Sequence, residues 1–214
     1  MLSMRDWAAW HTAYDDPASF LNVRLRMVQQ RLYEAIAAGP AGPVRLVSLC
    51  AGQGRDVIGV LPGHPRRDDV HAVLVESDPR NAEVASRTAA QAGLRQVEVR
   101  EADAAAVAGF ADALPADVLL LCGIFGNVSD EDIRLTVEAA SAMCRPGGIV
   151  IWTRHRRPPD LTPQVRAWFA ASGFDELAFE ALDTEDRMMS VGANRLRRAA
   201  TTGLPDRPLF TFRR

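Results

Sequence analysis

Hydrophobic and polar residues along this chain first form a helical pattern. Between Asp16 and Ala38 the apolar residues recur every three or four positions, which is the spacing of one face of an amphipathic helix. Asp16 and Ser19 are both candidate caps of this helix, because their side-chain oxygens can accept a backbone N–H. Glycines and prolines at residues 39–43 end the pattern and predict a linker.

From Val44 onward, short apolar runs alternate with helix-like stretches. The runs predict five buried strands, at Val44–Leu49, Val70–Val75, Val97–Val99, Val118–Leu121 and Ile149–Trp152. The stretches predict helices at Val57–Leu61, Pro79–Ala92, Asp130–Met143 and Pro163–Ser172. Strands and helices in alternation indicate βαβ units, that is, a parallel sheet covered on both faces.

The C-terminal part of the chain departs from this alternation. Glu176–Leu182 and Met188–Leu196 follow each other without a helical stretch between them, so we expect an antiparallel pair at one sheet edge. Leu209–Phe212 is a candidate for a last short strand. The predicted fold is α/β, with a doubly wound, mainly parallel, seven-stranded sheet and an N-terminal helical cap. Its 214 residues fit one structural domain, with residues 1–43 as a helical extension or lid and residues 44–214 as the body.

Charge and composition exclude several classes of function. A net charge of -2 gives the protein no overall excess of positive charge for binding nucleic acid or an anionic membrane. Every basic residue is arginine, which excludes a Schiff-base lysine and a phosphate-loop lysine. Cys50, Cys122 and Cys144 are widely spaced, so neither a disulfide framework nor a metal site is predicted. No segment resembles a secretory signal or a membrane span, and we expect a cytoplasmic protein with no membrane and no nucleic-acid partner.

The first two segments of chemical interest follow the first two predicted strands, where ligands bind in open α/β sheets. Gly52 and Gly54, in the loop Cys50–Arg55, let the backbone approach a ligand closely. A tight turn without a ligand is the simpler alternative. Glu76 closes the second strand about 20 residues later, where an acid accepts ribose hydroxyls in dinucleotide sites. An ordinary exposed carboxylate is the alternative for Glu76.

Two more segments follow the third and fourth predicted strands. Asp103 can accept a hydrogen bond from an adenine amino group while a neighbouring N–H bonds a ring nitrogen. Capping of the next helical turn is the competing role, and one aspartate can serve both. The segment Cys122–Asn127 contains two glycines that leave room beside the reactive end of a ligand, and Phe125 either covers that ligand or packs in the core.

This series of a glycine loop, two acids and a small-residue loop resembles the class I, Rossmann-like S-adenosylmethionine-dependent methyltransferases. The resemblance covers roughly Val44–Trp152, and the turn Arg145–Gly148 before the fifth strand is also typical of that family. It implies S-adenosylmethionine as cofactor and S-adenosylhomocysteine as product. It also implies a set of cofactor contacts. Ala51, Gly52 and Gly54 would lie against the methionine part and the ribose, and Glu76, with Ser77 beside it, would hold the ribose hydroxyls. Asp103 and Ala104 would bind adenine, and Cys122 and Gly123 would pass near the methyl donor.

Two features depart from the family pattern. Ser48 and Cys50 stand where the family usually has an acid and its first glycine. The contact at the methionine end must then come from Asp56, from Tyr14 or from a residue of the N-terminal helix. The segment after the fourth strand also lacks the Asn/Asp-Pro-Pro-aromatic motif of enzymes that methylate amino groups of DNA bases or glutamine, so those substrates are not expected.

Methyl transfer from a sulfonium requires a nucleophile held in line with the methyl group, and a general base only where the acceptor is protonated. The candidate catalytic residues are His11 and Tyr14, near Trp7 and Trp10, and His155 after the fifth strand. The aromatic residues either form a lid or pack the extension on the body. His155 is either a base or a solvated side chain.

The main functional hypothesis is a methyltransferase that acts on a small molecule. A catalytically silent cofactor-binding regulatory protein is the second, because Ser48 and Cys50 are unusual for the family. A nicotinamide-dependent oxidoreductase is the third. It is less consistent with the sequence, because Val57 stands where the dinucleotide fingerprint needs a third glycine.

Overall fold

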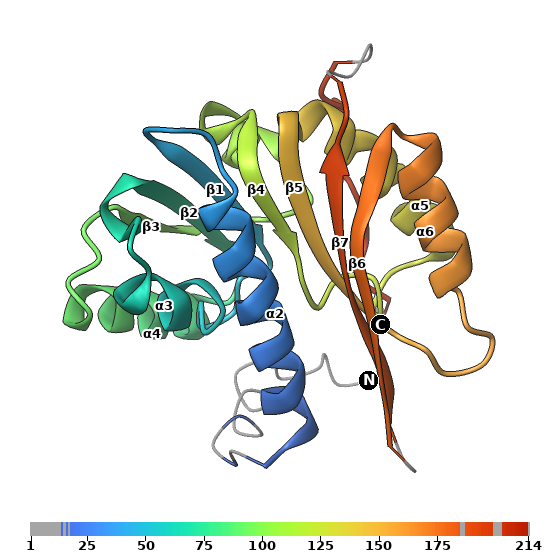
Figure 1. Ribbon diagram of the computed structural model, residues 1–214, viewed down its shortest axis with the longest axis horizontal. Helices are drawn as coiled ribbons and strands as arrows, with labels where there is room; N and C mark the ends of the chain where they lie inside the picture. The colour runs from blue at the N-terminus through green and yellow to red at the C-terminus, as the bar shows by residue number, and fades with distance from the viewer. Residues whose placement is uncertain (1–13, 15, 17, 185–186, 199–202, 214) are drawn as a thin grey trace.

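The computed structural model describes residues 14, 16, 18–184, 187–198 and 203–213. Figure 1 shows one sheet, with its strands in the order β3-β2-β1-β4-β5-β7-β6. The strands are β1 (Val44–Leu49), β2 (Val70–Glu76), β3 (Val97–Glu101), β4 (Ala116–Leu121), β5 (Cys144–His155), β6 (Phe174–Asp183) and β7 (Met188–Leu196). Strands β1 to β5 are parallel, and β7 runs antiparallel between β5 and β6. The predicted seven-stranded α/β fold is confirmed.

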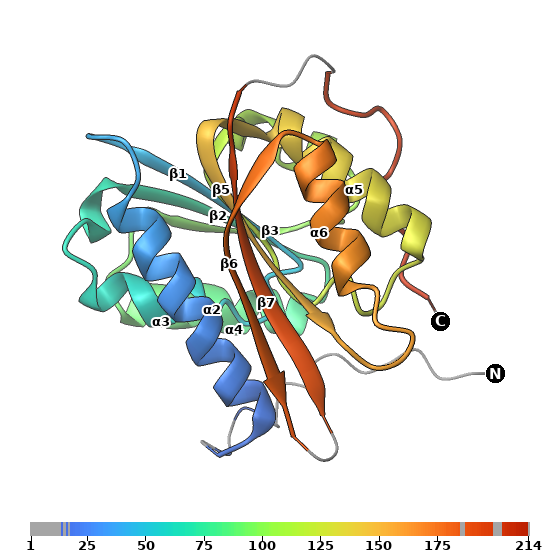
Figure 2. The same ribbon diagram turned by 45° about the vertical axis from the view of Figure 1, so that its right-hand side comes forward.

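Helices cover both faces of the sheet (Figure 2). On one face lie α2 (Phe20–Ala37), α3 (Val57–Val60) and α4 (Pro79–Gln91), and on the other lie α5 (Asp130–Met143) and α6 (Thr162–Ala171). Four short 3₁₀ turns connect these elements, at Leu61–Gly63, Arg67–Asp69, Val107–Gly109 and Ala111–Ala113. All six residues of β4 are buried, as expected for a parallel strand with helices on both sides.

The helix α2 begins at a defined cap and packs on the sheet. The Ser19 hydroxyl accepts the N–H of Asn22, so Ser19 and not Asp16 is the cap. The buried face of α2, which includes Val28, Leu32 and Ile36, contacts β4, β5, β7 and α3. The lid assigned to residues 1–43 stays a prediction, because residues 1–13 lie outside the described part. No described helix is both long and apolar enough to span a membrane.

The prediction of a strand at Leu209–Phe212 is wrong. Residues 203–213, called the C-terminal strap below, run past α5 in an extended path (Figure 2). Leu209 and Phe210 are buried in the core. The hydrogen bonds of the strap's backbone go to loops and to Asp132 and Thr136 of α5 instead of a neighbouring strand. The apolar run that suggested a strand therefore reflects anchoring of the strap in the core.

A close contact between β5 and β7 yields a stability test. Gly192 lies opposite Trp152, and a Cβ at Gly192 would overlap the indole. Trp152 is fully buried, and its Nε1 donates a hydrogen bond to Asn194 Oδ1 at 2.8 Å, so the ring has little room to move.

We predict that Gly192→Ala lowers the free energy of unfolding by about 1–3 kcal/mol, the usual cost of overpacking a core. Urea denaturation measures this change. Gly63→Ala is the control, because its added Cβ would meet no atom within 4 Å and should change stability by less than about 0.5 kcal/mol. Equal effects of the two substitutions would contradict the prediction.

Candidate functional site

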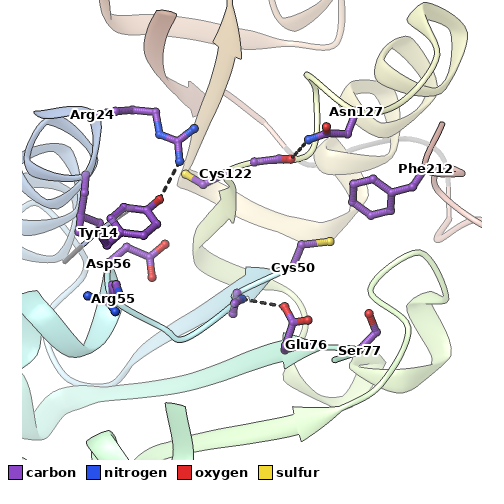
Figure 3. Close-up of a pocket in the computed structure, with 14 residues that line it drawn as sticks. Tyr14, Arg24, Cys50, Arg55, Asp56, Glu76, Ser77, Cys122, Asn127 and Phe212 are labelled. Carbon is purple, nitrogen blue, oxygen red and sulfur yellow. Dashed lines mark hydrogen bonds between the residues drawn. The ribbon is translucent and has the colours of Figure 1, made fainter. Parts of the chain in front are cut away.

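A cavity opens at the carboxyl ends of β1, β2 and β4 (Figure 3). Strand β1 lies between β2 and β4, so the strand order reverses here, which is where open α/β sheets bind ligands. The cavity holds about 990 Å³ of empty space, counting the part open to solvent. The residues that line it are Tyr14, Arg24, Leu25, Cys50, Ala51, Gly52, Arg55, Asp56, Glu76, Ser77, Cys122, Gly123, Asn127 and Phe212.

The loop after β1 forms the floor of the cavity. Cys50, Gly52 and Gly54 all adopt positive φ angles, of 53°, 56° and 67°, a conformation that costs glycine little and other residues more. Of the three predicted cofactor contacts in this loop, Ala51 and Gly52 line the cavity and Gly54 does not. A Cβ at Gly54 would lie 2.8 Å from Ile58 Cδ1 and 2.9 Å from Leu74 Cδ1. Glycine at position 54 therefore suits both the positive φ angle and the close packing between the loop, α3 and β2.

Glu76 connects the loop after β1 to the end of β2. Its Oε2 accepts the N–H of Gly52 at 2.7 Å, and its Oε1 accepts the N–H of Asp78 at 2.8 Å. Burial raises the pKa of Glu76, and these two backbone N–H groups oppose the rise. A carboxylate has about four acceptor positions, so each oxygen keeps capacity for a ligand hydroxyl. Ser77 follows at the exposed rim.

Three side chains form a charged end of the cavity. Arg24, buried on α2, donates from Nη2 to the Tyr14 hydroxyl at 2.9 Å. The Arg55 guanidinium lies over the Tyr14 ring, with Cζ 5.3 Å from its centroid, a cation–π geometry. Asp56 lies below Tyr14 in Figure 3, and its Oδ1 accepts the N–H of Val57 at 2.8 Å. Two cationic groups and one carboxyl group thus surround the phenol ring.

Asp56 is a buried carboxyl group with unused hydrogen-bonding capacity. It is 8% exposed, and within the described part of the chain no hydrogen bond reaches its Oδ2. Burial raises the pKa of Asp56 to about 6, while the Val57 N–H and the charge of Arg24 act in the opposite direction. A cationic ligand group beside Oδ2 would favour the ionised carboxylate.

The two thiols in the cavity are held in their protonated form. Burial raises the pKa of Cys50, and the carboxylates of Glu76 and Asp103 raise it further. Burial also raises the pKa of Cys122, and Asp56 adds to the rise. Because the thiolate is the nucleophilic form, these cysteines act at the cavity wall as small, apolar side chains.

Asp103 and Ala104 do not line the cavity. Asp103 is exposed, and its Oδ1 accepts the N–H of Ala105 at 2.9 Å within a turn. The next helical turn, Val107–Gly109, has Ala106 at its N-cap position and no side-chain cap, so the capping role weighed for Asp103 is wrong. Ala104 is buried in the core. Adenine binding by Asp103 and Ala104 stays a prediction.

The structure separates the candidate catalytic residues. Tyr14 lines the cavity, and its pKa is raised by burial, against the effect of Arg24. His155 ends β5 beside Gly126, outside the cavity lining. Its Nδ1 is buried without a hydrogen-bond partner in the described region, and burial with the charge of Arg154 lowers its pKa. His11 lies outside the described residues.

Sequence reasoning did not single out Arg24, Arg55 or Phe212, and it named Asn127 only as the end of the candidate segment Cys122–Asn127. Arg24 did leave a signal, because it lies four residues after Phe20 and four before Val28, on the apolar stripe of α2. Phe212 left none, because its position depends on the path of the strap. Asn127 lines the cavity while its Nδ2 donates to the Gly123 carbonyl at 2.7 Å. Among described residues, no cluster of His, Cys, Asp and Glu could hold a metal ion.

We predict that Asp56→Asn stabilises the ligand-free protein at pH 7. Asp56 has a higher pKa folded than unfolded, so the folded state binds more protons between pH 4 and pH 6, and stability falls as pH rises through that range. A shift from 3.8 to about 6 corresponds to roughly 3 kcal/mol at pH 7. Asparagine keeps the helix cap and removes the charge, so urea denaturation across this pH range should show a smaller decline.

Asp78→Asn is the matched control, since Asp78 also caps a helix but its pKa is lowered by hydrogen bonding to Arg80. Removing that charge should reduce stability at pH 7. If the stability of Asp56→Asn fell between pH 4 and pH 6 as much as that of the wild type, Asp56 would not be the cause of the decline.

Comparison with solved structures places this fold among methyltransferases. Magnesium protoporphyrin IX methyltransferase (ChlM) from Synechocystis PCC 6803 with bound SAH has a TM-score of 0.64 at 12% identity, over 87% of this chain and 92% of that chain. An O-methyltransferase family protein from Burkholderia thailandensis has a TM-score of 0.61 at 16% identity, over 88% of this chain and 59% of that one. Sp1610 from Streptococcus pneumoniae, "a putative tRNA (m1A22) methyltransferase", has a TM-score of 0.55 at 16% identity, over 84% of this chain and 72% of that one.

The sequence itself matches the model of a protein family. No curated protein matches the chain. The model of the family Methyltransf_20, described as "Putative methyltransferase", matches residues 14–172. That range runs from Tyr14 through α6 and includes most of the cavity lining. The chain therefore belongs to this methyltransferase family.

Proposed function

We propose that the protein transfers a methyl group from S-adenosylmethionine to a small-molecule acceptor. The observation that carries the proposal is the arrangement of charge in the cavity, with Glu76 at one side of the glycine loop and Arg24 with Asp56 at the other. Family membership supports methyl transfer. The structural similarity to SAH-bound and SAM-bound methyltransferases supports the choice of cofactor.

The cavity residues match the functional groups of this cofactor. Glu76 has acceptor capacity for the two ribose hydroxyls, beside the Gly52 backbone. At the charged end, Asp56 would take the ammonium group and Arg24 the carboxylate of the methionine part. We infer that Asp56 replaces the acid that the family usually has where this chain has Ser48, so the negative charge has moved from the strand to the start of α3.

The transfer step would depend mainly on positioning. When bound, S-adenosylmethionine supplies a methyl group on a sulfonium, which an acceptor nucleophile attacks. Cys122 and Gly123 would lie beside that methyl group, and the protonated thiol does not compete as a nucleophile. Tyr14, with its raised pKa and its bond from Arg24, is suited to orient the acceptor or shield it from water, rather than to remove a proton.

A small-molecule acceptor in a reducing compartment is the favoured form of the proposal. The net charge of -2 supports a small molecule over a polyanion, and the three unpaired cysteines support a reducing compartment. A tRNA acceptor is the second candidate, because Sp1610 shares the fold.

The decisive experiment measures cofactor binding and then turnover. Calorimetric titration with S-adenosylmethionine should show one site, and absence of binding at high micromolar ligand would refute the proposal. Incubation with a metabolite panel, and separately with tRNA, should then yield S-adenosylhomocysteine only with the correct acceptor. Binding without turnover in both sets would favour a regulatory protein, while binding of NADH instead would favour an oxidoreductase.

We predict that Glu76→Gln weakens S-adenosylhomocysteine binding roughly 10- to 100-fold, since hydrogen bonds to a charged partner contribute about 1.5–3 kcal/mol. Calorimetry measures the affinity, and urea denaturation verifies that the variant folds. Glu83→Gln on the exposed side of α4 changes the same side chain away from the cavity and should bind like the wild type. Equal losses of affinity in the two variants would show that Glu76 does not contact the ligand.

We predict that Arg24→Met weakens S-adenosylhomocysteine binding roughly 10- to 100-fold but leaves 5′-methylthioadenosine binding within about twofold, because the second ligand lacks the amino acid group. Methionine keeps the apolar length of the side chain that α2 buries. Arg26→Met, exposed on the same helix, is the control. Equal weakening of both ligands by Arg24→Met would show that Arg24 supports the fold of the cavity instead of the methionine end.

A further inference from the structure

The C-terminal strap contributes one aromatic side chain to the cavity. Phe212 is half-buried and lines the cavity on the side away from Tyr14 and Arg24 (Figure 3). We propose that Phe212 is the surface on which the adenine ring of the cofactor stacks, and that the strap is a built part of the binding site. The proposal rests on the proposed function and adds a residue outside the range matched by the family model.

Backbone hydrogen bonds fix the strap to the loops after β3 and β4. The N–H of Leu209 donates to the Ala105 carbonyl at 2.9 Å, in the loop after β3. The N–H of Arg213 donates to the Asn127 carbonyl at 2.7 Å, in the loop after β4. Phe212 lies between these two hydrogen bonds in the chain. Its position is therefore set by the same two loops that follow the third and fourth strands.

Core packing holds the strap in this path. Leu209 and Phe210 are 2% and 4% exposed, and the Thr136 hydroxyl of α5 donates to the Leu209 carbonyl at 3.0 Å. Phe210 and Phe212 meet edge to face, with ring centroids 5.5 Å apart and an interplanar angle of 79°, a favourable arrangement of two aromatic rings. Phe210 thus buttresses the Phe212 ring from the core side.

The distribution of polarity in the cavity decides which part of the ligand meets Phe212. Arg24, Asp56 and Tyr14 occupy one end, and the ribose acceptor Glu76 lies between them and Phe212 (Figure 3). A phenyl ring offers a flat apolar face with no hydrogen-bonding group, and a nucleobase stacks on such a face. Ser77, a small side chain just after β2, also lines the cavity. The base end of the cofactor therefore belongs at Phe212.

Substitution of Phe212 tests this assignment by calorimetry with two ligands, S-adenosylhomocysteine and 5′-methylthioadenosine. Phe212→Leu keeps an apolar side chain but removes the aromatic face, and we expect it to weaken both ligands about tenfold, within the range for loss of base stacking. Phe212→Tyr restores the aromatic face and should bind both ligands within about twofold of wild type. Weaker binding of both ligands distinguishes this effect from that of Arg24→Met, which should leave the binding of 5′-methylthioadenosine within about twofold.

Thr211→Ala is the matched control, because Thr211 is exposed on the same strap and its side chain does not line the cavity. Urea denaturation of each variant verifies the fold. Wild-type affinity of Phe212→Leu, or equal weakening in Phe212→Tyr, would overturn the stacking role while leaving the proposed function in place. No binding of either ligand to the wild type would overturn the proposed function and this inference together.

Discussion

The hydrogen bond from the Gly52 N–H to the Glu76 carboxylate is the interaction on which the site most depends. It joins the loop after β1 to the end of β2 at 2.7 Å inside the protein. Charge-assisted hydrogen bonds are strong when desolvated, so this one fixes a loop that contains three positive φ angles. The same bond places the carboxylate beside the backbone that a ligand would contact. One acidic side chain thus both holds the loop and lines the cavity.

Much of the fold could be predicted from the sequence, because burial on both faces leaves a strong local signal. The parallel strands β1, β2, β4 and β5 are rich in Val, Leu and Ile, whereas the edge strand β3 alternates Val with charged residues and is only partly buried. The antiparallel pair β6 and β7 was also predicted, because no helical pattern separates its two strands. The strap was misassigned as a strand, because two buried apolar residues, Leu209 and Phe210, look alike in sequence whether their backbone pairs with a strand or with loops.

The candidate site also has residues that the sequence could predict and residues that it could not. The topology of an open sheet brings strand ends together, so the convergence of five residues at or just after strand ends was predictable, namely Ala51, Gly52, Glu76, Cys122 and Gly123. Gly54 has the expected residue type for a different reason, which is contact with Ile58 and Leu74. Arg24 and Phe212 reach the cavity from elements whose packing depends on the whole fold, and no local pattern specifies that packing.

Asp56 gives the ligand-free protein an unusual acid-base property. Near pH 6 this buried carboxyl group is about half protonated, because burial raises its pKa to about 6. A ligand with an ammonium group would bind the ionised form and displace that proton into solvent. Ligand capture and proton release are then a single coupled event, and mild acidification of the surroundings would weaken the protein's hold on its ligand by protonating Asp56.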